Sequence, residues 1–177
     1  SCVRRVASGR VTDVDAVARV LLAGQSNAQG WTSTCTAETV PSVWIYSNGV
    51  WYDRVSVGHG FPFGPEMGLA RTLGWNMSKV AHGGTSIARW IPGTPFFAQL
   101  EALPLVEDCT LAWVQGESDA VSLDYASAYS SRLTDLIRGL RERTTCTRVR
   151  VVAALLKETP ILPFAHVVNA ALEVQAH

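Results

Sequence analysis

Short apolar runs alternate with amphipathic stretches along the 177-residue chain. Such alternation is typical of a parallel sheet that is covered by helices. Each apolar run is short enough for one buried strand, and the five runs are residues 18–23, 43–47, 77–81, 110–115 and 148–156. We therefore expect an α/β fold, a three-layer α/β/α sandwich around a mainly parallel five-stranded sheet.

Amphipathic stretches between these runs predict the helices. The clearest extends from about Asp124 to Arg143, where apolar side chains recur at helical spacing and are expected in the core. These side chains are Tyr125, Tyr129, Leu133, Leu136, Ile137 and Leu140. A second helix should follow Pro65, because proline suits a first helical turn, and should end near Gly74. A third helix is predicted from Val167 to Ala176.

The dipeptide Asn48-Gly49 lies between β-prone residues, a combination typical of a two-residue hairpin turn. It predicts a hairpin over Trp44–Tyr52 at the edge of the sheet. No repeat or low-complexity linker interrupts the chain, and its length is in the usual range of one domain. We therefore expect residues 1–177 to form a single domain.

Charge excludes one class of partner. The chain has 15 basic and 15 acidic side chains and a formal net charge of zero, so we expect no binding to nucleic acid or to an anionic membrane. No apolar run approaches the roughly 18 residues that span a bilayer, and no signal peptide is visible. Because the chain begins with Ser1, we expect a processed or excised product. A secreted, cell-surface or phage-particle location is favoured over the cytoplasm.

The four cysteines, at positions 2, 35, 109 and 146, show no Cys-x-x-Cys spacing, so the sequence predicts no zinc site. Cys109 and Cys146 each precede a predicted strand and should lie at the amino-terminal edge of the sheet. They are predicted to form a disulfide or to lie close to one another. Free thiols are the alternative.

The segment Gly24-Gln-Ser-Asn-Ala-Gln-Gly30 directly follows the first apolar run. A serine on the tight turn after a parallel strand points into the crevice where open α/β sheets bind ligands, which is the position of a nucleophile. Ser26 with Gln29 also fits a capping box at the start of a helix. The segment alone leaves both interpretations open.

Three further blocks follow in order: Phe63-Gly-Pro-Glu-Met67, Ala81-His-Gly-Gly-Thr-Ser-Ile87 and Val114-Gln-Gly-Glu-Ser-Asp119. With the serine segment, this order resembles the SGNH hydrolase superfamily over roughly residues 18–160, specifically its sialate O-acetylesterase and acetylxylan esterase branch, carbohydrate esterase family six. The resemblance implies a flavodoxin-like SGNH fold and a serine esterase that removes acetyl or other short acyl groups from carbohydrate through an acyl-enzyme.

Ester hydrolysis needs a nucleophile, a base and amide donors for the oxyanion. Ser26 would be the nucleophile, and its backbone N–H would be one oxyanion donor. Gly83-Gly84-Thr85 follows a strand and is expected to supply a second donor from Gly84, although a plain turn would also use these glycines. Gln115 follows another strand, and its side chain is expected at the same oxyanion. Gln25 and Asn27 would support the site.

The acidic residues of the last block have two interpretations. Acids after a strand are often solvated or cap the next helix. By resemblance, Glu117 would hydrogen-bond the serine segment and the glycine loop and hold the donors in place. A direct role in a catalytic triad is the other interpretation of Glu117. Asp119 is likewise expected to support the site.

The histidines are His59, His82, His166 and His177, and none follows an aspartate at the Asp-x-x-His spacing that the resemblance implies. His82 is expected to be a loop or core residue. We therefore expect the chain to lack the segment with the catalytic Asp and His, which a further domain or chain would supply. No cofactor and no metal are expected, because serine acyl transfer needs neither.

Two functions follow from these patterns. The first is the esterase, with acylated carbohydrate as substrate. The second is a non-catalytic glycan-binding or structural module of a larger cell-surface or phage protein, because a fold alone does not define an activity. Trp31 and Trp90 follow the two predicted site loops, and they are expected to stack against sugar or to be buried under a loop.

Overall fold

The computed structural model describes residues 10–11, 17–30, 43–52 and 64–175. These residues form a seven-stranded sheet in the order β1-β4-β3-β5-β2-β6-β7. The strands are β1 (Arg10–Val11), β2 (Ala18–Gly24), β3 (Ile45–Ser47), β4 (Val50–Tyr52), β5 (Met77–Ala81), β6 (Leu105–Val114) and β7 (Arg148–Ala153). The helices are α1 (Ser26–Gln29), α2 (Glu66–Leu73), α3 (Pro95–Glu101), α4 (Leu123–Ser127), α5 (Tyr129–Arg143), α6 (Ala165–Gln175) and the 3₁₀ turn η1 (Ile87–Arg89).

Five strands of the sheet are parallel, as the five apolar runs predict. β2 lies at the centre between β5 and β6, β3 flanks β5, and β7 flanks β6. β6 begins five residues earlier than expected, because the three residues between Leu105 and Cys109 are partly buried or exposed and include Glu107 and Asp108. The first half of the strand therefore forms no continuous apolar run.

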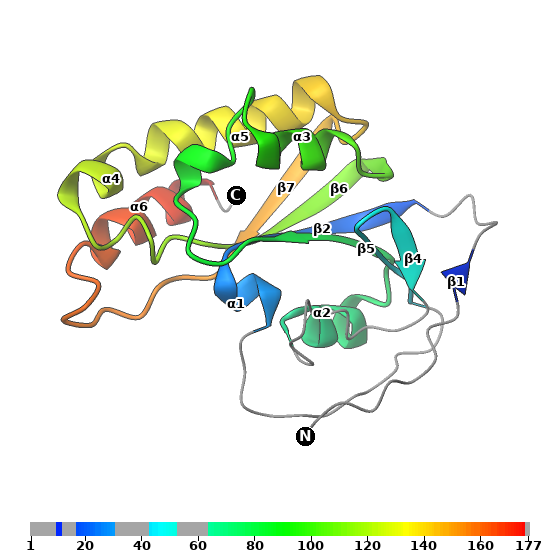
Figure 1. Cartoon of the computed structure of the whole chain (residues 1–177), viewed down its shortest axis with the longest axis horizontal. Coiled ribbons are helices and arrows are strands. Elements are labelled where there is room, and N and C mark those ends of the chain that lie inside the picture. Colours follow the sequence, from blue (N-terminus) through cyan, green and yellow to red (C-terminus); the bar gives the residue numbers. More distant parts are fainter. Residues whose placement is uncertain (1–9, 12–16, 31–42, 53–63, 176–177) are drawn as a thin grey trace.

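Helices cover both faces of the sheet, so the expected three-layer sandwich is confirmed (Figure 1). Helices α3, α5 and α6 lie on one face, and α1 and α2 lie on the other. Successive side chains of a strand point to opposite faces. Leu21 and Ala23 of β2 accordingly join the core under α5, whereas Val20 and Leu22 join the core with Met67 of α2.

The amphipathic stretch predicted as one helix is divided. α4 ends at Ser127, and α5 begins at Tyr129. Tyr129 is fully buried, but Tyr125 is 50% exposed, so its expected place in the core was wrong. Because Tyr125 belongs to the separate short helix α4, the apolar face of α5 does not continue to it.

The predicted hairpin is confirmed, although β1 pairs with β4 and lies beyond it at the edge of the sheet. β3 and β4 are antiparallel, and Ser47 pairs with Val50 across the turn. The two residues of the turn, Asn48 and Gly49, have φ of 51° and 79°. Positive φ at both positions is the requirement of a type I′ turn, which asparagine and glycine meet at low cost.

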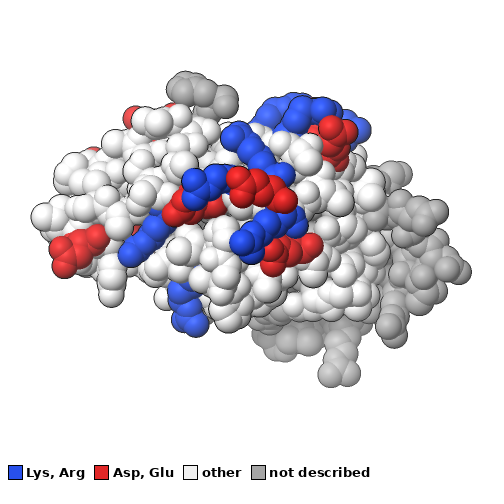
Figure 2. Space-filling model, turned by 90° about the horizontal axis from the view of Figure 1, so that it is seen from above, with Lys and Arg blue, Asp and Glu red and all other residues white. Residues whose placement is uncertain are grey.

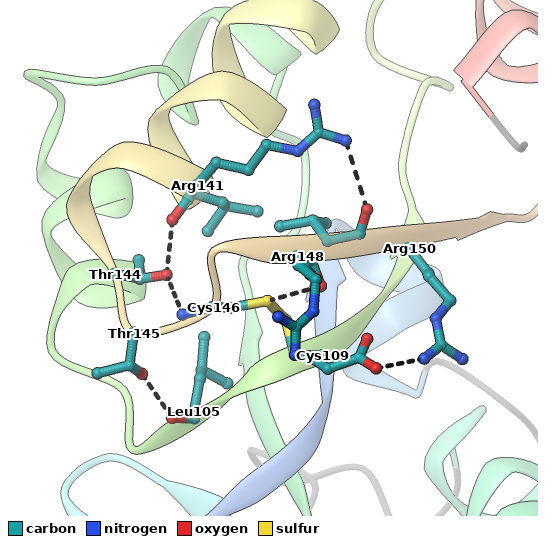
Figure 3. Close-up of a disulfide and its surroundings, with 11 residues drawn as sticks. Leu105, Cys109, Arg141, Thr144, Thr145, Cys146, Arg148 and Arg150 are labelled. Atoms are coloured by element: carbon teal, nitrogen blue, oxygen red, sulfur yellow. Dashed lines mark hydrogen bonds and ion pairs between the residues drawn. A yellow bond between two sulfur atoms is a disulfide. The ribbon is translucent and has the colours of Figure 1, made fainter.

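The predicted disulfide is also confirmed. Cys109 and Cys146 are bridged, with Cα atoms 5.6 Å apart (Figure 3). Cys109 lies inside β6, and Cys146 lies just before β7, toward the amino-terminal end of this strand. Thr145 Oγ1 donates to the Leu105 carbonyl oxygen beside the bridge. Cys2 and Cys35 lie outside the described residues.

Strand β7 is the last strand at one side of the sheet, and alternate side chains on it are exposed. These side chains are Arg148, Arg150 and Val152. Arg148 pairs with Glu107 at 2.8 Å and Arg150 with Asp108 at 2.6 Å, both acids being on β6. Basic and acidic side chains are also interspersed on the face seen in Figure 2.

Candidate active site

The carboxyl ends of the three central strands meet at one edge of the sheet. Gly24 of β2 pairs with Ala81 of β5 on one side and with Val114 of β6 on the other. The segments that follow these residues therefore begin side by side. From β2 the chain leads to β3, which lies beyond β5, and from β5 it crosses β2 to reach β6, so the strand order reverses at β2. Open α/β sheets bind their ligands at such a switch point.

Ser26 is the first residue of α1, a single turn that follows β2 directly. The N-cap position belongs to Gln25, which makes no side-chain cap. The capping-box interpretation of Ser26 was therefore wrong. Gly24 has a φ of 147°, and a Cβ there would lie 2.0 Å from the Val114 carbonyl oxygen. The sharp turn that presents Ser26 thus requires glycine before it.

The glycine loop lies against α1. A Cβ on Gly83 would be 3.9 Å from Ser26 Cβ and 2.9 Å from Gln29 Oε1. Gly84 is exposed with a φ of 66°, in the left-handed region. Thr85 is buried, and its hydroxyl donates to the His82 carbonyl oxygen at 2.7 Å. The structure therefore brings the loop of Gly83, Gly84 and Thr85 next to Ser26.

Gln115 ties three segments together. Its side chain is 1% exposed, and Nε2 lies 2.9 Å from the Thr85 carbonyl oxygen, 3.3 Å from Gln25 Oε1 and 2.6 Å from Asp119 Oδ2. The two amide hydrogens therefore face three protein acceptors. The expected oxyanion role of Gln115 stays a prediction, and its contacts in the structure hold the loops to one another.

Glu117 and Asp119 divide the supporting contacts. Glu117 Oε1 accepts a hydrogen bond from Asn27 Nδ2, on the serine segment. Asp119 is fully buried, and Oδ2 accepts from the Ile87 backbone N–H at 2.9 Å and from Gln115. Burial raises the pKa of the Asp119 carboxyl above its usual value, and the Gln115 hydrogen bond partly opposes this rise. The hydrogen bond to Ile87, just beyond the glycine loop, is therefore made by Asp119 and not by Glu117.

Trp90 does not face the site, so its expected stacking against sugar was wrong. Its side chain is 0% exposed and packs edge-on against Trp113, with ring centroids 5.5 Å apart. Its indole N–H donates to Thr85 Oγ1 at 3.1 Å. The 3₁₀ turn η1 carries Trp90 back into the core, which is the alternative left open by the sequence. Trp31 lies outside the described residues.

Two histidines lie in the described part of the chain. The ring of His82 stacks on Phe96 with centroids 4.0 Å apart, and Nε2 lies 2.9 Å from Gln99 Oε1. His166 is exposed at the start of α6. Within the described ranges no hydrogen bond joins Ser26 to a histidine. His59 and His177 lie outside them.

A buried ion pair that was not among the predicted site residues joins Lys79 of β5 to Glu66 of α2. Lys79 Nζ lies 2.8 Å from Glu66 Oε1 and donates to the Gln29 carbonyl oxygen at 3.2 Å. Burial raises the pKa of Glu66 and lowers the pKa of Lys79, and the attraction between the two opposes both shifts. The sequence signal that could have indicated this pair is a lysine in the middle of a buried strand.

A hollow of about 250 Å³ opens beside Asn27 and Glu117. Its other wall is the segment between β7 and α6, including Leu155, Leu156 and Ile161. Among the described residues, no cluster of His, Cys, Asp and Glu has the makings of a metal site. None of the helices in the described part of the chain is long and apolar enough to cross a membrane.

Known proteins resemble the chain in fold. A protein from Arabidopsis thaliana superposes with a TM-score of 0.69 at 18% identity, over 86% of this chain and 78% of that one. A carbohydrate acetylesterase from Xanthomonas citri gives a TM-score of 0.60 at 16% identity, over 89% of this chain and 47% of that one. The present chain thus spans about half the length of the Xanthomonas enzyme. No curated protein matches it in sequence.

A family-level match defines the class as a hydrolase of the esterase type. Residues 45–177 match the family described as carbohydrate esterase, sialic acid-specific acetylesterase. The chain belongs to this family. The match confirms the resemblance that the four ordered blocks indicated.

Proposed function

We propose that the protein is a serine esterase that removes acetyl or other short acyl groups from carbohydrate. The observation that carries the proposal is the position of Ser26 at the carboxyl end of the central strand, with Gly83 against its side chain. A nucleophile on such a turn is accessible to a substrate in the crevice of the sheet. The family match supports a carbohydrate ester as the substrate.

In the proposed reaction, Ser26 Oγ attacks the carbonyl carbon of the ester, and its proton passes to a base. The tetrahedral oxyanion accepts from the backbone N–H groups of Ser26 and Gly84. The C–O bond to the sugar then breaks, the sugar oxygen takes up the proton, and the acyl group stays on Ser26. Water attacks this acyl-enzyme, releases the carboxylic acid and restores the serine hydroxyl.

Supporting residues keep the donors in place in this mechanism. Gln25, Thr85 and Gln115 form one buried cluster of hydrogen bonds, and Asn27 is held by Glu117. Donors that are already oriented need no reorganisation when the oxyanion forms. Gln115 is the centre of this cluster, so we assign it a positioning role, with its amide close enough to the loops to influence both donors.

We propose that the base is a histidine, paired with an aspartate, that lies outside the described residues on a further segment or partner chain. His82 is engaged by Phe96 and Gln99, and His166 is exposed on α6, so neither supports the role. General-base assistance is typically worth about 10²–10⁴-fold. Residues 1–177 alone should then hydrolyse activated esters poorly, and a longer form carrying the Asp-x-x-His segment should be active.

The test is hydrolysis of p-nitrophenyl acetate, O-acetylated sialic acid and acetylxylan by both forms, with Ser26→Ala as the control. Loss of activity on Ser26→Ala in the longer form would support the proposal. Full activity of residues 1–177 that disappears on His82→Ala or His177→Ala would instead identify a base within the chain. Glycan binding by an inert longer form would favour a non-catalytic module, an alternative motivated by the lack of a histidine bonded to Ser26 among the described residues.

A further inference from the structure

A lysine and a glutamate are buried together beneath the nucleophile segment. Lys79 occupies the middle of β5, and Glu66 is the first residue of α2. Their side chains are only 3% and 1% exposed. A Cβ on Gly64 would lie 2.2 Å from Glu66 Oε2, so a glycine two residues earlier leaves room for the carboxylate. The Gly-Pro-Glu part of the second sequence block thus builds this pair.

Lys79 makes a second contact, with the end of α1. Its Nζ donates to the carbonyl oxygen of Gln29, the last residue of that helix. The last carbonyl groups of a helix have no partner within it, and a cation is favourable at this end. A helix of one turn is not stable by itself in water. Contacts from outside must therefore keep α1 in place, and Lys79 supplies one.

Stability alone does not account for a pair of this kind. Two buried charges lose their hydration, and apolar replacements of similar volume are often neutral or stabilising. Burial raises the pKa of Glu66 and lowers the pKa of Lys79, so both shifts favour the neutral forms, as this cost requires. Glu66 Oε2 also has no hydrogen-bond partner among the described residues. The contact between Lys79 and α1 is what an apolar pair would lack.

We propose that Lys79, oriented by Glu66, is a positioning residue that fixes α1 and thereby the direction of the Ser26 side chain. The role in catalysis rests on the proposed function, because it assumes that Ser26 is the nucleophile. Among the described residues Lys79 Nζ bonds to Gln29 and Glu66 and not to Ser26. Its effect on turnover should therefore be on kcat, with KM nearly unchanged.

The test replaces both charges together, as Glu66→Leu/Lys79→Met, so that no unpaired charge stays buried. The matched control is Glu107→Leu/Arg148→Met, which removes an exposed ion pair of the same sheet. Hydrogen exchange of the Gln29 and Gly30 amides, which bond to Gln25 and Ser26, reports on α1 without any substrate. We expect their exchange to quicken about thirtyfold in the first variant, the size expected for one hydrogen bond to a charged group.

In the longer form with the Asp-x-x-His segment, kcat for p-nitrophenyl acetate should fall by a similar factor in that variant only. Unchanged exchange of the α1 amides in the folded variant would overturn the proposal. Should Glu66→Leu/Lys79→Met not fold, Glu66→Gln/Lys79→Met keeps one polar group and carries the same expectation. Activity that does not depend on Ser26 would refute the proposed function, and the exchange measurement would still decide the positioning of α1.

Discussion

Replacing Gln115 by methionine should lower the free energy of unfolding by more than one hydrogen bond, although it removes only one amide group. Methionine preserves the length and much of the volume of the side chain but cannot donate to Gln25, Thr85 and Asp119. Two amide hydrogens serve these acceptors, and one of them bonds to a buried carboxylate. With about 1 kcal/mol for a neutral hydrogen bond and about 2 kcal/mol for one to a charged group, the loss is about 3 kcal/mol.

The assay is urea unfolding followed by tryptophan fluorescence. For an m-value of about 2 kcal/mol per molar, the midpoint should fall by about 1.5 M. Gln175→Met is the matched control, because the Gln175 amide makes a partly exposed bond to Thr134 at 3.3 Å. That variant should change the midpoint little. Equal midpoints for the two variants would refute the reasoning that Gln115 binds the loops together.

Further predictions concern the turn, the disulfide and the buried acid. Gly24→Ala should prevent correct folding, since the added Cβ would lie 2.0 Å from the Val114 carbonyl oxygen. The control Gly68→Ala, at a helical position with open space around it, should raise the melting temperature slightly. Replacing Cys109 and Cys146 by serine, which opens a link between residues 37 apart, should lower the free energy of unfolding by about 4 kcal/mol in calorimetry. The pKa of Asp119 is raised in the folded state, so its ionisation should lower the stability of the protein as the pH rises above 3.8. In urea unfolding across this pH range, the wild type should lose stability relative to Asp119→Asn. A difference between the two proteins that stays constant with pH would contradict this prediction.

The strands and the position of Ser26 could be predicted from the sequence because their signals are local. A continuous apolar run such as Val20–Ala23 indicates a buried strand, and Asn48-Gly49 indicates its own turn. The edge where the site residues gather follows from parallel topology alone. The pairing of Cys109 with Cys146 was predicted from the same rule, since each cysteine precedes a predicted apolar run, although Cys109 lies inside β6 because this strand begins at Leu105.

Contacts between distant segments could not be predicted in this way. The burial of Trp90 depends on its packing against Trp113. In the first half of β6, Leu105 pairs with Ala18 of β2, and Asp108 and Cys109 pair with β7. The contact of Lys79 with Gln29 joins residues 50 positions apart. Such partners have no signature in the local pattern, so the sequence indicated which residues gather at the site but not which of them hold one another.

The exposed arginines on β7 have a consequence for solubility. An outermost strand leaves one row of backbone N–H and C=O groups unpaired with the sheet, and another copy of the chain can extend the sheet there. Arg148 and Arg150 flank this row, with Val152 as the apolar position after them. A second β7 that approached edge to edge would bring four guanidinium groups together. The ion pairs with β6 thus keep Arg148 and Arg150 beside the exposed edge of β7, where their charges oppose pairing with another copy of the chain.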